Sequence, residues 1–292
     1  MNLSVHSFFD ATTATFSHVI DDGAGACAVI DPVLGFDPQS GCTDARPVEL
    51  VAAHIQAQGL RVQWLLETHV HADHLSGAPW LQERFGGTLA IGARVTEVQR
   101  AFRDVFNAQD MAVDGSQFDR LFADGDAFAI GRLQAQALHV PGHTPADMAY
   151  RIADPAGGPD AVFVGDTLFM PDLGTARCDF PGGDAPTLFR SIRRLLALPP
   201  RTLLHVCHDY PPAGREAMGS TTVAQQRAGN IHARDGVSEA DFVALRETRD
   251  ATLALPALML PSVQVNMRAG RLPPPEANGI AYLKIPVDRP RD

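Results

Sequence analysis

Three imidazoles and a carboxylate fall within the six consecutive positions from His69 to His74. The apolar stretch 62–66 shortly before them predicts a buried strand that ends at this cluster. Buried imidazole and carboxylate groups lose hydration and need partners, so folding alone gains nothing from crowding them together. One divalent metal ion satisfies all of them, and such clusters are typical of metal sites. The segment therefore predicts a metal centre at the edge of a sheet.

The same arrangement of a strand followed by a polar donor recurs later in the chain. The apolar segments predicted as strands are 133–140, 161–164 and 202–206. Because the ends of strands meet along one edge of a sheet, the donors that follow them are expected to converge. The complete set of expected donors is His69, His71, Asp73, His74, His143, Asp166 and His208.

The rest of the chain mixes strand and helix patterns. Strand-like segments cover 3–9, 15–20 and 26–30, and helical spacing covers 47–58, 78–85, 185–197 and 239–253. Ser238, with Asp241 three residues later, predicts an N-cap for the last of these helices. The mixture predicts an α/β or α+β fold. We find no linker, so one domain is expected over 1–292, with a small helical extension from about residue 211.

Composition narrows the partners and the compartment. A formal net charge of −10 opposes a nucleic-acid substrate, which favours a basic face. The apolar runs are strand-sized and the first residues lack a secretory signal, so a cytoplasmic protein without a membrane span is expected. Paired spacing is absent among the cysteines, which predicts no disulfide framework. They are Cys27, Cys42, Cys178 and Cys207.

The pattern H-x-H-x-D-H, followed by a later His, Asp and His, resembles that of the metallo-β-lactamase superfamily. The resemblance implies an αββα sandwich that carries the donor loops along one edge. Two branches that act on glutathione thiol derivatives look similar to this chain. One is glyoxalase II, a dinuclear thioester hydrolase, in which Asp166 would bridge two ions. The other is the persulfide dioxygenase branch, which is mononuclear and iron-dependent.

Three more segments resemble the persulfide dioxygenase branch. They are G-T-A-R-C-D-F at 174–180, H-D-Y at 208–210 and N-M-R-A-G at 266–270. A bacterial subgroup of β-lactamase-like hydrolases, associated with sulfide detoxification, looks especially similar. Ala176 and Cys178 stand where that branch usually has glycine and threonine. These two departures affect the expected shape of the thiol pocket and not the metal loops.

By this resemblance, one Fe(II) per chain would be held by His69, His143 and Asp166, with positions left for a persulfide sulfur and O₂. The implied reaction oxidises glutathione persulfide, or a similar small persulfide, to sulfite and thiol. The other donors would orient ligands or substrate, or would form a second metal site; they are His71, Asp73, His74 and His208. A thioester hydrolase with one or two Zn²⁺ is the alternative, and a non-catalytic protein that binds metal and sulfur species is the third reading.

Four side chains are candidates for substrate contact: Arg177, Cys178, Tyr210 and Arg268. Arg177 has the structural alternative of fixing its own loop through Asp179. Tyr210 has the alternative of packing with its hydroxyl satisfied, and Cys178 that of a small buried residue rather than a thiol that exchanges sulfur. Arg268 is expected to meet a glutathione carboxylate or to be an ordinary surface arginine. The family also implies a homodimer.

Overall fold

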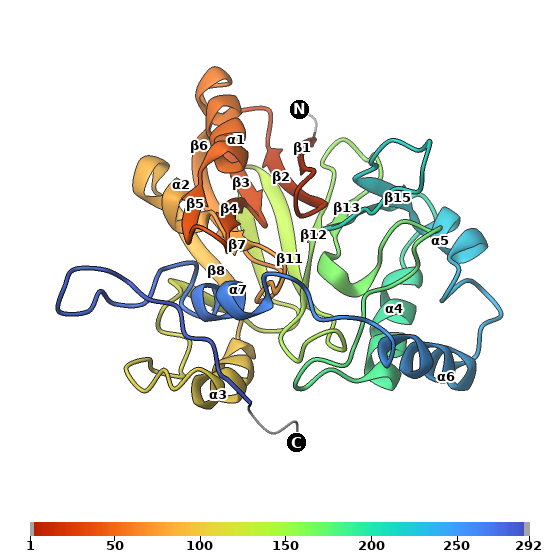
Figure 1. The fold of residues 1–292 in the computed structure, drawn as a ribbon. Coiled ribbons are helices and arrows are strands. Elements are labelled where there is room, and N and C mark those ends of the chain that lie inside the picture. Colours follow the sequence, from red (N-terminus) through yellow and green to blue (C-terminus); the bar gives the residue numbers. More distant parts are fainter. Residues whose placement is uncertain (1–2, 289–292) are drawn as a thin grey trace.

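Two six-stranded sheets lie face to face in the computed structural model, which describes residues 3–288 (Figure 1). The first sheet has the order β1 (Ser4–Asp10), β2 (Thr15–Asp21), β3 (Ala26–Ile30), β6 (Arg61–Leu66), β8 (Thr88–Gly92) and β9 (Arg120–Phe122). The second has the order β10 (Ala127–Ile130), β11 (Leu133–His139), β12 (Met148–Ile152), β13 (Ala161–Phe163), β14 (Leu203–His205) and β15 (Ser220–Thr222). A small third sheet has the order β5 (Cys42–Asp44), β4 (Val33–Asp37) and β7 (Leu75–Ser76).

Helices cover the outer faces of the two large sheets. The helices are α1 (Arg46–Ala57), α2 (Ala78–Phe85), α3 (Val95–Val105), α4 (Ala185–Leu196), α5 (Val223–Gly229), α6 (Glu239–Asp250) and α7 (Met259–Asn266). Figure 1 shows α1 and α2 beside the first sheet and α4, α5 and α6 on the side of the second. The predicted αββα sandwich is therefore confirmed. No helix between residues 3 and 288 is long and apolar enough to cross a bilayer.

Successive residues of the central strands point into different apolar layers. In β3, Cys27 joins the layer beneath α1 and α2, whereas Ala28 lies between the two sheets. In β13, Val162 joins the layer beneath α4, whereas Phe163 lies between the sheets. Side chains alternate in this way because a strand has a period of two residues. Strands that are buried on both faces read as continuous apolar runs, which is why they are visible in the sequence.

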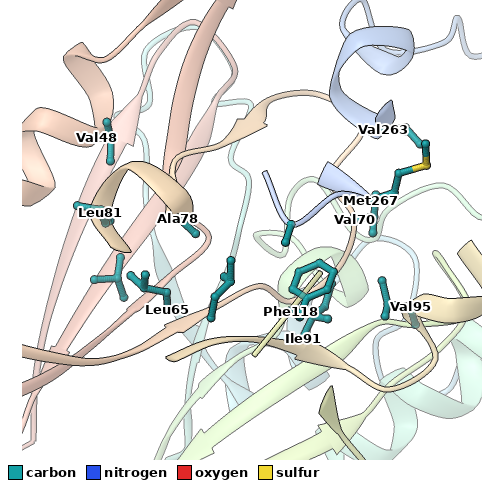
Figure 2. Packing of buried hydrophobic residues seen from close by; sticks show 14 of the residues in the cluster. Val48, Leu65, Val70, Ala78, Leu81, Ile91, Val95, Phe118, Val263 and Met267 are labelled. Carbon is teal, nitrogen blue, oxygen red and sulfur yellow. The ribbon is translucent and has the colours of Figure 1, made fainter. Parts of the chain in front are cut away.

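The apolar layer outside the first sheet also includes the C-terminal helix α7. Figure 2 shows Val263 and Met267 close to Val70, which lies in the histidine-rich loop, while Val48 of α1 and Leu81 of α2 belong to the same layer farther along. All five side chains are buried. Packing therefore attaches the end of the chain to the loop that carries the first donors.

Most elements predicted from the sequence are confirmed to within a few residues. The segments predicted over 26–30 and 78–85 coincide with β3 and α2. The predicted cap of α6 is also present, because the Ser238 hydroxyl oxygen accepts a hydrogen bond from the backbone N–H of Asp241 at 3.1 Å. The helix predicted to reach residue 253 ends at Asp250. The elements not predicted are β4, β5, β7, β8, β9, β10, β12, β15, α3, α5 and α7.

Candidate metal centre

The predicted metal triad comes together where β6, β11 and β13 end. One ligand atom each from His69, His143 and Asp166 lies within 4.8 Å of the other two, and all three residues are buried. Asp166 Oδ2 is 4.0 Å from Nε2 of His69 and 3.6 Å from Nε2 of His143. Three segments that are far apart in the chain thus supply two imidazoles and a carboxylate at one point.

Hydrogen bonds at Nδ1 of His143 and of His69 leave Nε2 of each ring directed toward the other members of the triad. Nδ1 of His143 donates to the Arg177 carbonyl at 2.7 Å. The Thr68 hydroxyl donates to Asp31 at 2.9 Å, so its oxygen accepts from Nδ1 of His69 at 3.0 Å. Nε2 of His69 is buried without a hydrogen-bond partner among the described residues. Burial, aided by the charge of neighbouring histidines, holds the pKa of His69 well below its usual range, and a neutral imidazole is the form that binds metal.

Two glycines let these loops approach their neighbours. Gly142, directly before His143, has a φ of 141°, and a Cβ there would collide with the backbone of Leu188 in α4. Gly174 has a φ of 88°, and a Cβ there would meet the ring of His232. Only glycine satisfies both the backbone angle and the space at these positions.

A second group of donors lies on the other side of Asp166. Nε2 of His208 is 3.2 Å from Asp73 Oδ2 and 3.4 Å from Asp166 Oδ1. His71 also belongs to this group, with one ligand atom within 4.8 Å of those of Asp73 and His208. Burial alone would lower the pKa of His208, but the adjacent carboxylates outweigh it and raise that pKa well above its usual range. These contacts are compatible with both roles predicted for the second group, which are to bind a second metal ion and to orient the ligands of the first.

Two buried carboxylates that the sequence analysis did not identify hold His71. Its Nε2 is 3.0 Å from Asp31 Oδ1 and 3.3 Å from Glu67 Oε2. Burial opposes a charge on His71, but Asp31 and Glu67 prevail and raise its pKa well above the usual range. Desolvation raises the pKa of Glu67, whose other oxygen accepts from the Ser76 hydroxyl. The sequence did contain one indication of these two residues, since Asp31 directly follows the buried strand β3 and Glu67 directly follows β6.

Asn266 of α7 is a third residue that sequence reasoning missed, although it lies in the N-M-R segment. Its side-chain amide donates to the carbonyls of His71 and His74 at 2.9 and 2.7 Å. Its carbonyl oxygen accepts from the backbone N–H of Ser76 at 2.8 Å. Asn266 is buried, so these bonds fix the conformation of the histidine-rich loop.

The two arginines predicted to contact substrate have partners within the protein. Arg177 donates to both carboxylate oxygens of Asp179 at 2.5 and 2.6 Å and to the carbonyl of Ala254 at 2.6 Å. The ion pair with Asp179 is the loop-fixing contact that the sequence predicted for Arg177 as the alternative to a contact with substrate. Arg268 forms a two-point ion pair with Asp110 at 2.8 and 2.9 Å. A contact between either arginine and substrate stays a prediction.

Cys178 and Tyr210, the other two candidates for substrate contact, differ from each other in solvent exposure. Cys178 is buried, and its backbone N–H and thiol both donate to Asp250, at 2.9 and 3.5 Å. Burial and the nearby Asp250 raise the pKa of this thiol, which disfavours the thiolate needed for sulfur exchange. Tyr210 is half exposed, and its ring stacks on His208 at a centroid distance of 5.9 Å. Tyr210 is therefore the candidate that substrate can reach beside the donors.

Comparisons with known proteins bear on the whole chain. The family model described as Metallo-beta-lactamase superfamily matches residues 12–208. A probable metallo-hydrolase of Burkholderia pseudomallei (strain 1710b) is 58% identical over 98% of this chain and 99% of its own length. Glyoxylase B2 of Dictyostelium discoideum is 47% identical over 92% of this chain and 91% of its own length.

More distant similarity connects the chain to persulfide dioxygenases. The mitochondrial persulfide dioxygenase ETHE1 of Bos taurus is 27% identical over 93% of this chain and 90% of its own. The crystal structure of ETHE1 from Myxococcus xanthus superposes with a TM-score of 0.72 at 28% identity, over 92% of this chain and all of that one. The chain spans only 64% of the beta-lactamase hydrolase-like protein of Xylella fastidiosa (strain Temecula1), with 48% identity. The matched family model includes every donor loop described above, and the chain therefore belongs to the metallo-β-lactamase superfamily.

Proposed function

We propose that this chain is an iron-dependent persulfide dioxygenase that oxidises glutathione persulfide, or a similar small persulfide, with O₂ to sulfite and thiol in sulfide detoxification. The observation that carries the proposal is that His69, His143 and Asp166 form a complete donor group without His71. Two imidazoles and one carboxylate are the ligand set of non-haem Fe(II) oxygenases. The likeness to the ETHE1 proteins supports the same assignment.

The chain's own residues would bind and orient, while a bound ferrous ion would supply redox chemistry and open coordination positions. The Arg177 carbonyl and the Thr68 hydroxyl hold the two imidazoles in the orientation that exposes Nε2. A small apolar pocket beside His143 is lined by Val70, Phe102 and Phe180, among others. Such a wall suits the carbon and sulfur atoms at the reactive end of a thiol persulfide.

A zinc-dependent thioester hydrolase of the glyoxalase II type is the second candidate. It is favoured by the 47% identity to Glyoxylase B2 and by the presence of the second donor group, which includes Asp73 and His208. Zinc would serve such a reaction by lowering the pKa of a bound water that attacks the thioester. The complete triad and the ETHE1 likeness favour the dioxygenase.

The proposal also covers partners and compartment. A small thiol persulfide and O₂ are the proposed reactants, and the net charge of −10 opposes a nucleic-acid substrate. A cytoplasmic homodimer is the proposed form of the protein.

A paired assay separates the two candidate functions. Metal-free protein is loaded with either Fe(II) or Zn²⁺, and each form is offered glutathione persulfide in an oxygen electrode and a glutathione thioester in a hydrolysis assay. We expect persulfide-dependent O₂ uptake by the iron form only, with sulfite as product. Thioester cleavage by the zinc form, without O₂ uptake by the iron form, would identify the chain as a hydrolase instead.

A further inference from the structure

We propose that Arg215 is a positioning residue that joins the loops after β13 and β14 and so holds Tyr210 in place beside the donors. Nη1 and Nη2 of Arg215 donate to the two carboxylate oxygens of Asp209 at 2.7 and 2.6 Å. Its Nε donates to Asp172 at 2.9 Å. One guanidinium therefore bridges two carboxylates from different loops. That the substrate beside Tyr210 is a persulfide rests on the proposed function, whereas the contacts of Arg215 do not.

Asp209 closes the loop that carries Tyr210. It directly precedes Tyr210, and its side chain is fully buried. Besides the two bonds from Arg215, its carboxylate accepts from the backbone N–H of Met218 at 2.7 Å. Its own backbone N–H donates to the carbonyl of Ala14 at 3.1 Å. The chain from Asp209 to Met218 is therefore a compact loop whose two ends are held together by one carboxylate.

Asp172 lies in the loop after β13, and bonds from the region of α5 hold this loop in place. The side chain of Gln226 in α5 donates to the carbonyl of Phe169 at 2.7 Å. The backbone N–H of Ile231, shortly after α5, donates to the carbonyl of Pro171 at 2.9 Å. Asp172 is thus a fixed point, to which the guanidinium ties the loop after β14.

The ring of Tyr210 spans the same two loops that the guanidinium joins. It stacks on His208 at a centroid distance of 5.9 Å and meets the ring of Phe169 edge-on at 6.1 Å. Phe169 belongs to the loop after β13 and His208 to the loop after β14. Aromatic contacts are individually weak, so the place of a half-exposed ring depends on the backbone that carries it. Fixing the two loops relative to each other therefore fixes the wall that Tyr210 offers to a substrate at the donors.

A direct bond from Arg215 to a substrate carboxylate is the alternative role, and the existing contacts of Arg215 oppose it. Nη1 also donates to the carbonyl of Glu216 at 3.1 Å, and Nη2 also donates to Asp172 at 3.4 Å. Every N–H group of the guanidinium therefore has an acceptor within the chain. Asp209 and Asp172 neutralise its charge and would repel an incoming anion. Arg215 consequently acts through the loops that it joins.

Fluorine NMR of metal-free protein tests the positioning of Tyr210 without an assay of activity. The chain has three tyrosines, so protein labelled with 3-fluorotyrosine gives few resonances, and Tyr210→Phe identifies that of Tyr210. We expect Arg215→Lys to move this resonance toward that of free 3-fluorotyrosine, because lysine keeps the charge but cannot hold two carboxylates in one fork. Asp172→Ala, which removes an exposed carboxylate, should move the resonance in the same direction.

The matched control is Arg227→Lys in α5. Arg227 pairs with Asp235 at the surface, with Nε and Nη2 both 2.9 Å from the same carboxylate oxygen. The same substitution there removes a similar ion pair that does not touch the loop of Tyr210. We expect the resonance of Tyr210 to stay at its parental position in this variant.

Kinetics of the iron-loaded protein measure what the position of Tyr210 does for the substrate. In Arg215→Lys, KM for glutathione persulfide should rise by about 10-fold with a smaller change in kcat, because the lost wall serves substrate binding. The iron content should stay at that of the parent. A merely stabilising ion pair would lower the melting temperature without this split between KM and kcat.

Each outcome decides the proposal. A Tyr210 resonance that keeps its parental position in Arg215→Lys, or that moves as far in Arg227→Lys, overturns it. Movement in only one of two folded variants, Arg215→Lys and Asp172→Ala, overturns the bridge between the loops, and Asp172→Ala decides by itself if Arg215→Lys does not fold. A moved resonance with parental KM overturns the effect on substrate. Because the NMR uses metal-free protein, it decides the positioning role even where absent O₂ uptake by the iron-loaded parent contradicts the dioxygenase proposal.

Discussion

The hydrogen bond already made by one nitrogen of each histidine decides what the other nitrogen can bind. Nδ1 of His143 and of His69 is engaged, so Nε2 of each ring faces Asp166. Nε2 of His71 is engaged by Asp31, so this ring presents Nδ1 elsewhere. The donors therefore divide into separate groups although they share one loop.

Replacing Asp166 and Asp73 by asparagine tests that division. We expect Asp166→Asn to lower iron affinity by about 100-fold or more, because it removes the carboxylate ligand of the triad. Asp73→Asn is the matched control, since Asp73 contacts His208 and is outside the triad, and it should keep one iron per chain. Iron content is measured after anaerobic loading and desalting. Equal loss of iron from both variants would show that the triad is not an independent site.

A pair of buried histidines between the sheets makes stability depend on pH. Burial lowers the pKa of His18 to about 4 and that of His205 to about 3. Both rings are neutral in the folded protein, whereas the unfolded chain takes up protons below pH 6.5, so the free energy of unfolding falls as pH drops from about 6.5 toward 3. For His205, whose pKa falls from 6.5 in the unfolded chain to about 3 in the folded one, the full loss is about 5 kcal/mol.

His205→Phe should remove much of this acid sensitivity. The ring of His205 stacks on Phe163 at 4.7 Å, and neither of its nitrogens has a hydrogen-bond partner in the described part of the chain. An apolar ring therefore loses no bond there, and we expect a gain of about 1 kcal/mol at pH 7 with a shallower decline below pH 6.5. Chemical unfolding of metal-free protein at several pH values measures how the free energy of unfolding changes with pH. The substitution His6→Phe, at an exposed histidine, is the control. An unchanged slope in His205→Phe would contradict the explanation.

The sequence revealed the donors because they lie in short motifs directly after strands. It did not reveal Asn266, whose hydrogen bonds reach carbonyls 192 and 195 residues away. It did not assign Asp31 or Glu67 either, because a single carboxylate after a strand is common and only the fold brings both onto His71. For Arg177 the sequence left open a contact with substrate and a loop-fixing ion pair with Asp179, and the ion pair is present.

Among the elements, helix α6 holds the loop at 174–180 from outside the centre. Arg246 is buried, pairs with Asp250 at 2.7 Å and donates to the Thr175 carbonyl at 3.0 Å. Asp250 in turn accepts from the backbone of Cys178 at 2.9 Å. The Arg177 carbonyl, which holds His143, lies between these two attachments. The ion pair of α6 therefore positions a metal ligand that it does not touch.

A single and a double variant separate the stability of this ion pair from its positioning role. Arg246→Met alone should cost about 3–5 kcal/mol, because it leaves Asp250 buried and unpaired. Arg246→Met with Asp250→Leu should recover most of that stability, but iron affinity should stay about 10–100-fold below the parent, because the loop loses both attachments. Thermal unfolding of metal-free protein and iron titration provide the two readouts. Parental iron affinity in the double variant would show that α6 does not position His143.

Strands and helices were predictable where the spacing of apolar residues repeated over enough positions. Strands with long apolar runs such as β3 were found, but β8 and β12 were missed although they are almost fully buried. Short strands such as β7, with two residues, and β15, with three, carry no period at all. Helix α3 did have a signal that was missed, since Val95, Val98 and Phe102 recur at helical spacing and are buried. Residues 262–266 of helix α7 alternate between polar and apolar side chains and are all buried, so this helix shows no one-sided apolar pattern.

At the scale of the whole molecule, the C-terminal segment leaves an apolar surface that fits the expected homodimer. A groove of about 600 Å³ is lined by Leu255, Met259, Tyr282 and Ile285, among others. Leu255 is 58% exposed and Ile285 71% exposed. Exposed apolar surface of this kind is typical of protein interfaces.

Charged substitutions in that groove should prevent self-association. We expect the parent to be a dimer in light scattering after gel filtration, and Leu255→Asp with Ile285→Asp to be a monomer with the same circular dichroism spectrum. Leu50→Asp on α1 introduces a charge at an equally exposed leucine and should leave the dimer intact. A monomeric parent, or equal dissociation by Leu50→Asp, would contradict this assignment of the interface.

The sandwich and the convergence of its loops were predictable because four strand ends carry the donors. The return of the chain over the first sheet through α7 was not, because it depends on contacts between Val70 and residues near 265 that no local pattern encodes (Figure 2). That return brings Asn266 to the metal loops and adds Val263 to the wall of the pocket beside His143.

Metal analysis of protein purified without oxygen, combined with an oxygen-electrode assay, tests the central claim most directly. We predict one iron per chain, O₂ uptake that requires glutathione persulfide, and sulfite as product. Two zinc ions per chain bridged by Asp166, with thioester cleavage and no persulfide-dependent O₂ uptake, would contradict it.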